Sequence, residues 1–351
     1  MSITFNVPIN SVSLGQTSIA ILREAYKANL DCCIFPIGPV DLSAQNPDPK
    51  FDQWLHQKIK ESPKHHKRTN RAIKLWHISD INQSYGAEPE CVTFLETDAC
   101  SAHEVAALNN QKVTWVTSNY TKEVMEDYGV KNVKYLELGL DTHSFYKTDR
   151  KYYASDVTVI GFGGKFETSR KKHIEIIRAL AQKYGNNPKI MIHAAVFNPF
   201  FSGEDNSKMI QHALEGKKYF NFVFLPFMQK NAEYNDFLNS CDVFLGMSGG
   251  EGRDLPVYQA AALGKKIVAL NAHAYKDYLN HDNAWLVEPN GKCSCVDNVF
   301  FHANSDYNTG NFFTWDKDEF LAKLEECIKS PPQQQFKFVT YKETFDQLLN
   351  G

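Results

Sequence analysis

The residues best suited to chemistry are a glycine turn and the cations that follow it. After the apolar run VTVIGF come Gly163, Gly164 and Lys165, and six positions later comes Lys171, with a basic residue on each side. A glycine turn that leaves a strand exposes backbone N–H groups, and the start of a helix adds partial positive charge. The segment does not match the dinucleotide-binding motif, because Phe166 stands where that motif needs glycine. The spacing therefore predicts a diphosphate site, with an ordinary helix start and solvated lysines as the alternative.

A second candidate site lies in the stretch SGGEGRDLPVYQAAALG, residues 248–264. Glu251 and Gly252 follow an apolar strand, and Pro256 falls where a first helical turn begins. A carboxylate there can accept hydrogen bonds from sugar hydroxyls, and the neighbouring amides can face phosphate oxygens. Gln259, two helical turns beyond Glu251, is expected to face the same ligand.

Polar residues also follow predicted strands in the first half of the chain. His77, Glu96 and Asp98 come directly after apolar runs, at the strand ends where α/β sheets bind ligands. Gly15 lies in the turn after the first strand. For Gly15 the alternative is a simple turn glycine, and for His77 it is a structural role beside Trp76.

The elements that must position these residues repeat in two blocks. Residues 3–9 alternate like a strand, and a polar turn leads from them to an amphipathic helix over residues 18–28. Strands and helices then alternate until a polar connection at residues 147–155, after which a new strand starts the pattern again. This alternation predicts an α/β protein with two doubly wound, Rossmann-like domains.

The two motifs together resemble the retaining glycosyltransferases of family 4, which have the GT-B fold. Lys165 and Lys171 match the spacing of the family's Arg/Lys pair, and residues 251–268 resemble its Glu-x7-Glu motif. Similar segments extend over most of residues 90–290. The resemblance implies two facing Rossmann-like domains with a cleft between them. The expected parts are an acceptor-side domain over 1–150, a nucleotide-sugar domain over 151–332, and a terminal helix over 336–351 that packs back on the first.

The resemblance also implies roles for single residues. Lys165, Lys171 and Glu251 are the expected catalytic residues, and the acceptor side is expected at His77, Glu96 and Asp98. The expected donor-binding residues are Gly15, Gly164, Lys165, Lys171, Phe227, Glu251, Gly252, Arg253, Asp254, Leu255 and Gln259.

This sequence departs from the family pattern at several of these positions. Gln259 replaces the second glutamate, and its amide can still both donate and accept at a ribose. Lys165 replaces an arginine that is frequent in the family, so phosphate would meet the point charge of an ammonium group instead of a bidentate guanidinium. Arg253 and Asp254 replace Phe and Gly and make the loop more polar.

The function implied is transfer of a hexose, with retention, from a UDP- or GDP-linked sugar to a hydroxyl acceptor, most simply a saccharide or lipid-linked glycan. The lysines would stabilise the charge that develops on the departing diphosphate. No Asp-x-Asp motif is present, and we expect neither a metal nor a cofactor. Cys293, Cys295 and His302 lack the fourth ligand and the spacing of a zinc site.

The composition agrees with a globular protein of two domains. The chain has 351 residues, of which 43% are hydrophobic and 23% charged, and this length exceeds what one core supports. Its eight cysteines are scattered, as in proteins with reduced thiols. No apolar run reaches the roughly 20 residues that span a bilayer, and no secretory signal opens the chain. We therefore expect a cytoplasmic protein without a transmembrane segment, and nothing in the sequence sets its oligomeric state.

Two other functions stay open at this point. The first is a glycosyltransferase that acts on modified bases of nucleic acid, an anionic polymer. Residues 58–74 are rich in lysine and arginine, which is typical of a solvated surface and also of a patch that binds such an acceptor. The change to Gln259 leaves room for a non-catalytic sugar-nucleotide-binding protein.

Overall fold

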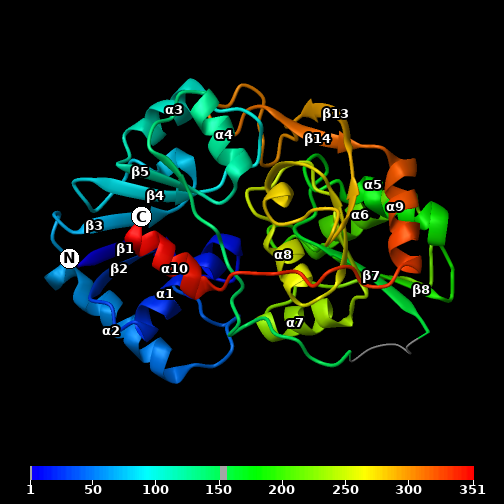
Figure 1. Cartoon of the computed structure of the whole chain (residues 1–351), viewed down its shortest axis with the longest axis horizontal. Helices are drawn as coiled ribbons and strands as arrows, with labels where there is room; N and C mark the ends of the chain where they lie inside the picture. Colours follow the sequence, from blue (N-terminus) through cyan, green and yellow to red (C-terminus); the bar gives the residue numbers. More distant parts are fainter. Residues whose placement is uncertain (1, 151–155) are drawn as a thin grey trace.

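The computed structural model describes residues 2–150 and 156–351, which form two α/β halves side by side (Figure 1). Each half contains a parallel six-stranded sheet. The predicted α/β fold with two Rossmann-like domains is therefore confirmed. The predicted boundary after residue 150 adjoins residues 151–155, which lie outside the described residues.

The first sheet has the strand order β2-β1-β3-β4-β5-β6. Apolar clusters cover both of its faces, one involving α1 and α2 and the other involving α3 and α4. The elements are β1 (Ile3–Pro8), α1 (Ser13–Lys27), β2 (Cys32–Ile37), α2 (Pro49–His65), β3 (Arg71–Leu75), the short 3₁₀ helix η1 (Ile78–Asp80), β4 (Pro89–Thr93), α3 (Ala102–Asn109), β5 (Val113–Val116), α4 (Asn119–Asp127) and β6 (Val133–Tyr135).

The second sheet has the order β12-β11-β10-β7-β8-β9 and also carries an apolar cluster on each face. One predicted strand, FNFVFLPF, is shorter than expected, because only Phe222–Phe224 pair with β8. The elements are β7 (Thr158–Gly163), α5 (His173–Tyr184), β8 (Ile190–Ala195), α6 (Gly203–Ala213), β9 (Phe222–Phe224), α7 (Asn231–Ser240), β10 (Val243–Gly246), α8 (Leu255–Ala262), β11 (Lys266–Leu270), η2 (His273–Asp277), β12 (Trp285–Val287) and α9 (Lys317–Lys329).

Side chains near the helix starts explain several boundaries. Asp48 accepts a hydrogen bond from the backbone N–H of Phe51, and Pro49 occupies the first turn of α2. α3 begins with a capping box, in which Ser101 and Glu104 each bind the other's backbone N–H. These local contacts satisfy N–H groups that the helices leave free.

The carboxyl ends of the two sheets face each other. Thr117, just after β5, donates to the carbonyl of Gly252, which follows β10, at 2.8 Å. Glu96, after β4, contacts Arg170, after β7, at 2.8 Å. The loops that leave the strands, where α/β proteins bind ligands, therefore meet at the junction of the two halves.

The C-terminal helix α10 (Tyr341–Asn350) crosses back to the first half (Figure 1). Tyr341, Phe345 and Leu348 join the apolar cluster formed with α1. The chain reaches it through a parallel bridge between Leu140 and Thr340. The first half is thus completed by residues from the end of the chain.

A hairpin with one polar strand, which the sequence pattern did not reveal, ties the halves together near α3. Its strands are β13 (Pro289–Ser294) and β14 (Asn311–Trp315). The backbone N–H of Asn308, in the connection between them, donates to Glu104 at 2.8 Å. The described residues contain no helix that is long and apolar enough to cross a membrane.

Candidate functional site

The predicted anion-binding turn is the loop between β7 and α5. β7 ends at Gly163, and Gly164 follows with φ of 119°, a conformation that residues with side chains rarely adopt. A Cβ atom on Gly164 would lie 3.2 Å from Cε of Lys171, so the glycine leaves room for Lys171 to cross the turn. Lys172 then occupies the N-cap position of α5 with φ of 55°, and the helix begins at His173. The turn thus brings Lys171 close to a helix N-terminus.

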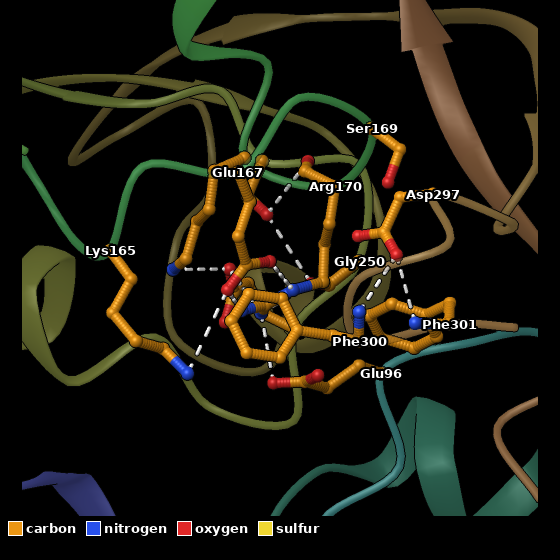
Figure 2. Close-up of polar contacts among 12 residues, drawn as sticks. Glu96, Lys165, Glu167, Ser169, Arg170, Gly250, Asp297, Phe300 and Phe301 are labelled. Atoms are coloured by element: carbon orange, nitrogen blue, oxygen red, sulfur yellow. Dashed lines mark hydrogen bonds and ion pairs between the residues drawn. The ribbon is translucent and has the colours of Figure 1, made fainter. Parts of the chain in front are cut away.

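The centre of the site is a cluster of ion pairs (Figure 2). Lys171 Nζ lies 2.5 Å from Glu251 Oε1. The Arg170 guanidinium contacts Glu251 at 3.1 Å, Glu167 at 2.7 Å and Glu96 at 2.8 Å. Glu96 is the member that comes from the first half of the chain. The structure therefore joins the glycine turn, the Glu251 loop and a strand end of the opposite sheet.

Burial and charge set the protonation of this cluster. Burial alone would raise the pKa of Glu251, but Arg170 and Lys171 outweigh it and hold this pKa at about 2. For Glu96 the balance is reversed, since burial, with help from Glu251, raises its pKa despite the contact with Arg170. Glu251 is thus ionised and lies beside two cations, whereas Glu96 is the carboxyl that takes up a proton more readily.

Lys165 lies at the rim of the cluster. Its ammonium is 3.9 Å from Glu167 and stands over the rings of Phe300 and Phe200, at 4.7 Å and 5.3 Å from their centres. Its side chain is 37% exposed, against 10% for Lys171. Desolvation lowers the pKa of Lys165. It is therefore the more accessible of the two predicted lysines.

Asp254 adds a second carboxylate beside Lys171. It occupies the N-cap of α8 with φ of 54°, and its Oδ2 lies 3.9 Å from Lys171 Nζ. The Tyr275 hydroxyl donates to the same oxygen at 2.6 Å, while the buried Oδ1 has no hydrogen-bond partner in the described structure. Burial raises the pKa of Asp254, and Lys171 offsets this only in part.

Gly252 and Arg253 make contacts with the first half of the chain. The Gly252 carbonyl accepts from Thr117, and the Arg253 guanidinium donates to the carbonyl of Leu138 at 2.5 Å. Arg253 is 1% exposed and lies 4.2 Å from the ring centre of Tyr258. The structure thus places Arg253 in the junction, with its guanidinium shielded from solvent.

The remaining predicted donor residues have other environments. Leu255 packs against the apolar cluster of the first half. Gln259 is half-buried on α8, and Phe227 is half-buried in the loop after β9. Gly15 lies in the first turn of α1, where a Cβ atom would come within 2.3 Å of Asn10 Oδ1. That close approach accounts for the glycine by packing.

The predicted acceptor residues have separate environments. Glu96 belongs to the ion-pair cluster. Partial desolvation and the Lys165 ammonium lower the pKa of His77, although the side chain as a whole stays exposed to solvent. Asp98 is paired with Lys292 of the hairpin at 2.8 Å, an interaction that holds the two halves together. Of the three, Glu96 and His77 lie nearest to the cations of the glycine turn.

Sequence reasoning missed two important members of the cluster. Arg170 was visible only as a basic neighbour of Lys171, and Glu167 stands three positions before it. That spacing is compatible with an ion pair, but nothing local indicates which of three consecutive cations turns inward. Tyr275 gave no signal, because its contact with Asp254 joins residues that are far apart in sequence.

The basic stretch at residues 58–74 is partly structural. Arg71 pairs with Glu90 at 2.6 Å, and the buried Lys74 donates to backbone carbonyls at the end of η1 and in the loop after it. Lys67 is exposed, but it precedes β3, at the amino end of the sheet. It therefore lies at the edge opposite to the strand ends that form the ion-pair cluster.

Cys293, Cys295 and His302 do not form a cluster in the structure. Among residues 2–150 and 156–351, no group of three or more His, Cys, Asp or Glu side chains has the arrangement of a metal site. Cys293 lies 3.2 Å from the ammonium of Lys172.

Comparison with known proteins identifies the fold. No family model and no curated protein matches the chain. Among solved structures, a sucrose-phosphate synthase from Thermosynechococcus elongatus aligns with a TM-score of 0.68 and 13% identity, over 100% of this chain and 95% of that protein. HepE from Anabaena in complex with UDP-glucose aligns with a TM-score of 0.55 and 17% identity, over 83% and 86%. An α,α-trehalose 6-phosphate synthase from Burkholderia multivorans gives 0.58 and 10%, over 94% and 92%. The chain therefore has the GT-B fold of these glycosyltransferases.

Proposed function

We propose that this protein is a retaining glycosyltransferase of the family 4 type, which moves a hexose from a nucleotide diphosphate sugar to a hydroxyl acceptor. The observation that carries the proposal is the ion-pair cluster at the facing strand ends, where Lys171 and Glu251 meet beside a glycine turn. We expect the acceptor to be a saccharide or lipid-linked glycan and the protein to work in the cytoplasm, as predicted from the sequence.

The diphosphate would bind to the turn that contains Gly164, with Lys165 and Lys171 as its cations. Both lysines are now paired with carboxylates of the protein, and Lys171 is only 10% exposed. A ligand must therefore replace the Lys171–Glu251 contact, which requires the loops or the two halves to move apart. Such movement is common in enzymes that close over their substrates.

In the reaction, the bond between the anomeric carbon and the diphosphate oxygen breaks, and its electron pair stays on the diphosphate. A bond forms between the anomeric carbon and the acceptor oxygen, whose proton leaves with the diphosphate. Once the ligand has replaced Glu251, the lysines would be fixed in position before the charge develops, and such preorganised charges are the usual source of electrostatic catalysis. Lys165 and Lys171 would supply that stabilisation without a metal.

Glu251, released from Lys171, would accept hydrogen bonds from hydroxyls of the donor sugar. Arg170, 3.1 Å from Glu251, would stay beside it and favour the ionised form, which acts only as an acceptor. Gln259 would bind the ribose. Glu96 and His77, from the opposite half, would face the acceptor.

The proposal is tested by turnover. Purified protein is incubated with UDP-glucose or GDP-mannose and a panel of saccharide acceptors, and release of nucleoside diphosphate is measured with and without a chelator. We expect acceptor-dependent release that the chelator leaves unchanged, and a product whose anomeric configuration, read by proton NMR, equals that of the donor. Binding of a sugar nucleotide without turnover on any acceptor would favour a non-catalytic binding protein.

A further inference from the structure

A buried tyrosine hydroxyl lies against the glycine turn without a partner. Tyr234 is on α7, and its hydroxyl oxygen is shielded from solvent and makes no hydrogen bond within the described structure. A Cβ atom on Gly163 would lie 2.7 Å from this oxygen. The glycine at position 163 therefore gives the hydroxyl room to approach the backbone of the turn.

The position of the ring is fixed from several sides. It packs against Phe237, with ring centres 5.4 Å apart, and against Phe145 at 6.4 Å. At the start of α7, Asn231 and Gln16 exchange two amide hydrogen bonds, of 2.8 Å and 3.0 Å. Because the helix and the ring are both held in place, the hydroxyl cannot easily turn to another partner.

Buried hydroxyls in native proteins are nearly always hydrogen-bonded, since an unpaired one loses its contacts with water and gains nothing. Burial and the nearby Asp254 raise the pKa of Tyr234, so the phenol keeps its proton. A protonated phenol beside a glycine turn can donate to an anion bound there.

We propose that the Tyr234 hydroxyl is a further binding group of the glycine turn, and that it donates a hydrogen bond to a phosphate oxygen of a bound nucleoside diphosphate. This inference rests on the proposed function. It adds α7 to the two loops that the sequence motifs identify.

The chain contains a matched control. Tyr184 also carries a buried hydroxyl without a hydrogen bond, but it stands at the last residue of α5, the end remote from the turn. Tyr184→Phe and Tyr234→Phe each remove one unsatisfied hydroxyl and leave the ring in place. Both variants should melt at or above the temperature of the wild-type protein.

The experiment measures binding of UDP and of inorganic pyrophosphate to the full-length wild-type protein and both variants by calorimetry. We expect Tyr234→Phe to weaken both ligands about tenfold, as for the loss of one hydrogen bond to a charged group, and Tyr184→Phe to bind as wild type does. If Tyr234→Phe binds both ligands as tightly as wild type does, the inference is overturned and the proposed function stays intact. The same conclusion follows if both variants lose affinity equally. If the wild-type protein binds neither of these ligands nor GDP, the proposed function fails and this inference with it.

Discussion

Replacing Asp254 by asparagine should strengthen the binding of a nucleotide sugar. The carboxylate lies 3.9 Å from Lys171 Nζ and therefore competes with any phosphate for the same ammonium. Asparagine keeps the shape of the side chain and tolerates the left-handed backbone, so that the change removes mainly the charge.

The size of the effect follows from Coulomb's law. At an effective dielectric constant of about 20, two unit charges about 4 Å apart interact by roughly 4 kcal/mol. A phosphate held by Lys171 would lie farther from Asp254 than this ammonium does, so we take the repulsion between phosphate and Asp254 as half of that energy, about 2 kcal/mol. This repulsion corresponds to roughly thirtyfold in affinity. We expect UDP-glucose to bind Asp254→Asn about ten- to thirtyfold more tightly than wild type.

The pH dependence gives a second readout by calorimetry. Burial raises the pKa of Asp254, and a bound anion would raise it further, so binding takes up a proton. Wild-type affinity for UDP-glucose should therefore increase as pH falls toward that raised pKa. The asparagine variant should keep only the part of this dependence that Glu96, whose pKa is also raised, contributes. Asp277, a half-buried residue, also has a raised pKa, and Asp277→Asn serves as the control that should change neither quantity. Weaker binding by Asp254→Asn would refute the reasoning and show that the carboxylate orients Lys171 for the ligand.

Three further predictions concern the cluster and the basic surface. Lys165→Ala and Lys171→Ala should each weaken nucleotide-sugar binding and slow transfer by about ten- to a hundredfold, the value of a charge-assisted contact of about 1.5–3 kcal/mol; unchanged titrations and rates would remove both lysines from the site. Glu251→Ala should depress transfer but leave UDP binding intact or improved, because it frees the Lys171 ammonium; an equal loss of both would assign Glu251 to the nucleotide or to the fold. Replacing Lys64 and Lys67 by glutamate should leave the acceptor KM at low salt and the melting temperature nearly unchanged, since both residues are exposed at the edge remote from the cluster. A KM that is higher at low salt and returns to the wild-type value at high salt would instead identify the basic surface as an acceptor site.

Short-range patterns carried most of the information that the sequence offered. The glycine turn before Lys165 and the loop at Glu251 each fall within one strand–loop–helix unit, where spacing alone constrains the geometry. The buried, apolar parallel strands were recognisable for the same reason. The hairpin of β13 and β14 was missed because its first strand, PNGKCS, is polar and largely exposed.

Long-range charge pairing was the part that local patterns could not reveal. The contact between Glu96 and Arg170 joins the two halves of the chain, and no local feature indicates it. Arg71 stood out as part of a basic surface in the sequence, yet it is paired with Glu90 and caps the end of α10. In both cases the partner is supplied by a distant segment that folding brings close.

Titration of the wild-type protein and the Lys171→Ala variant with UDP-, GDP- and ADP-linked sugars tests the central claim most directly. If the ion-pair cluster is a donor site, at least one of these ligands should bind the wild-type protein and raise its melting temperature, because it stabilises only the folded state. The same ligand should bind Lys171→Ala at least tenfold more weakly. Failure of every sugar nucleotide to bind, or equal binding by both proteins, would contradict the assignment of the site.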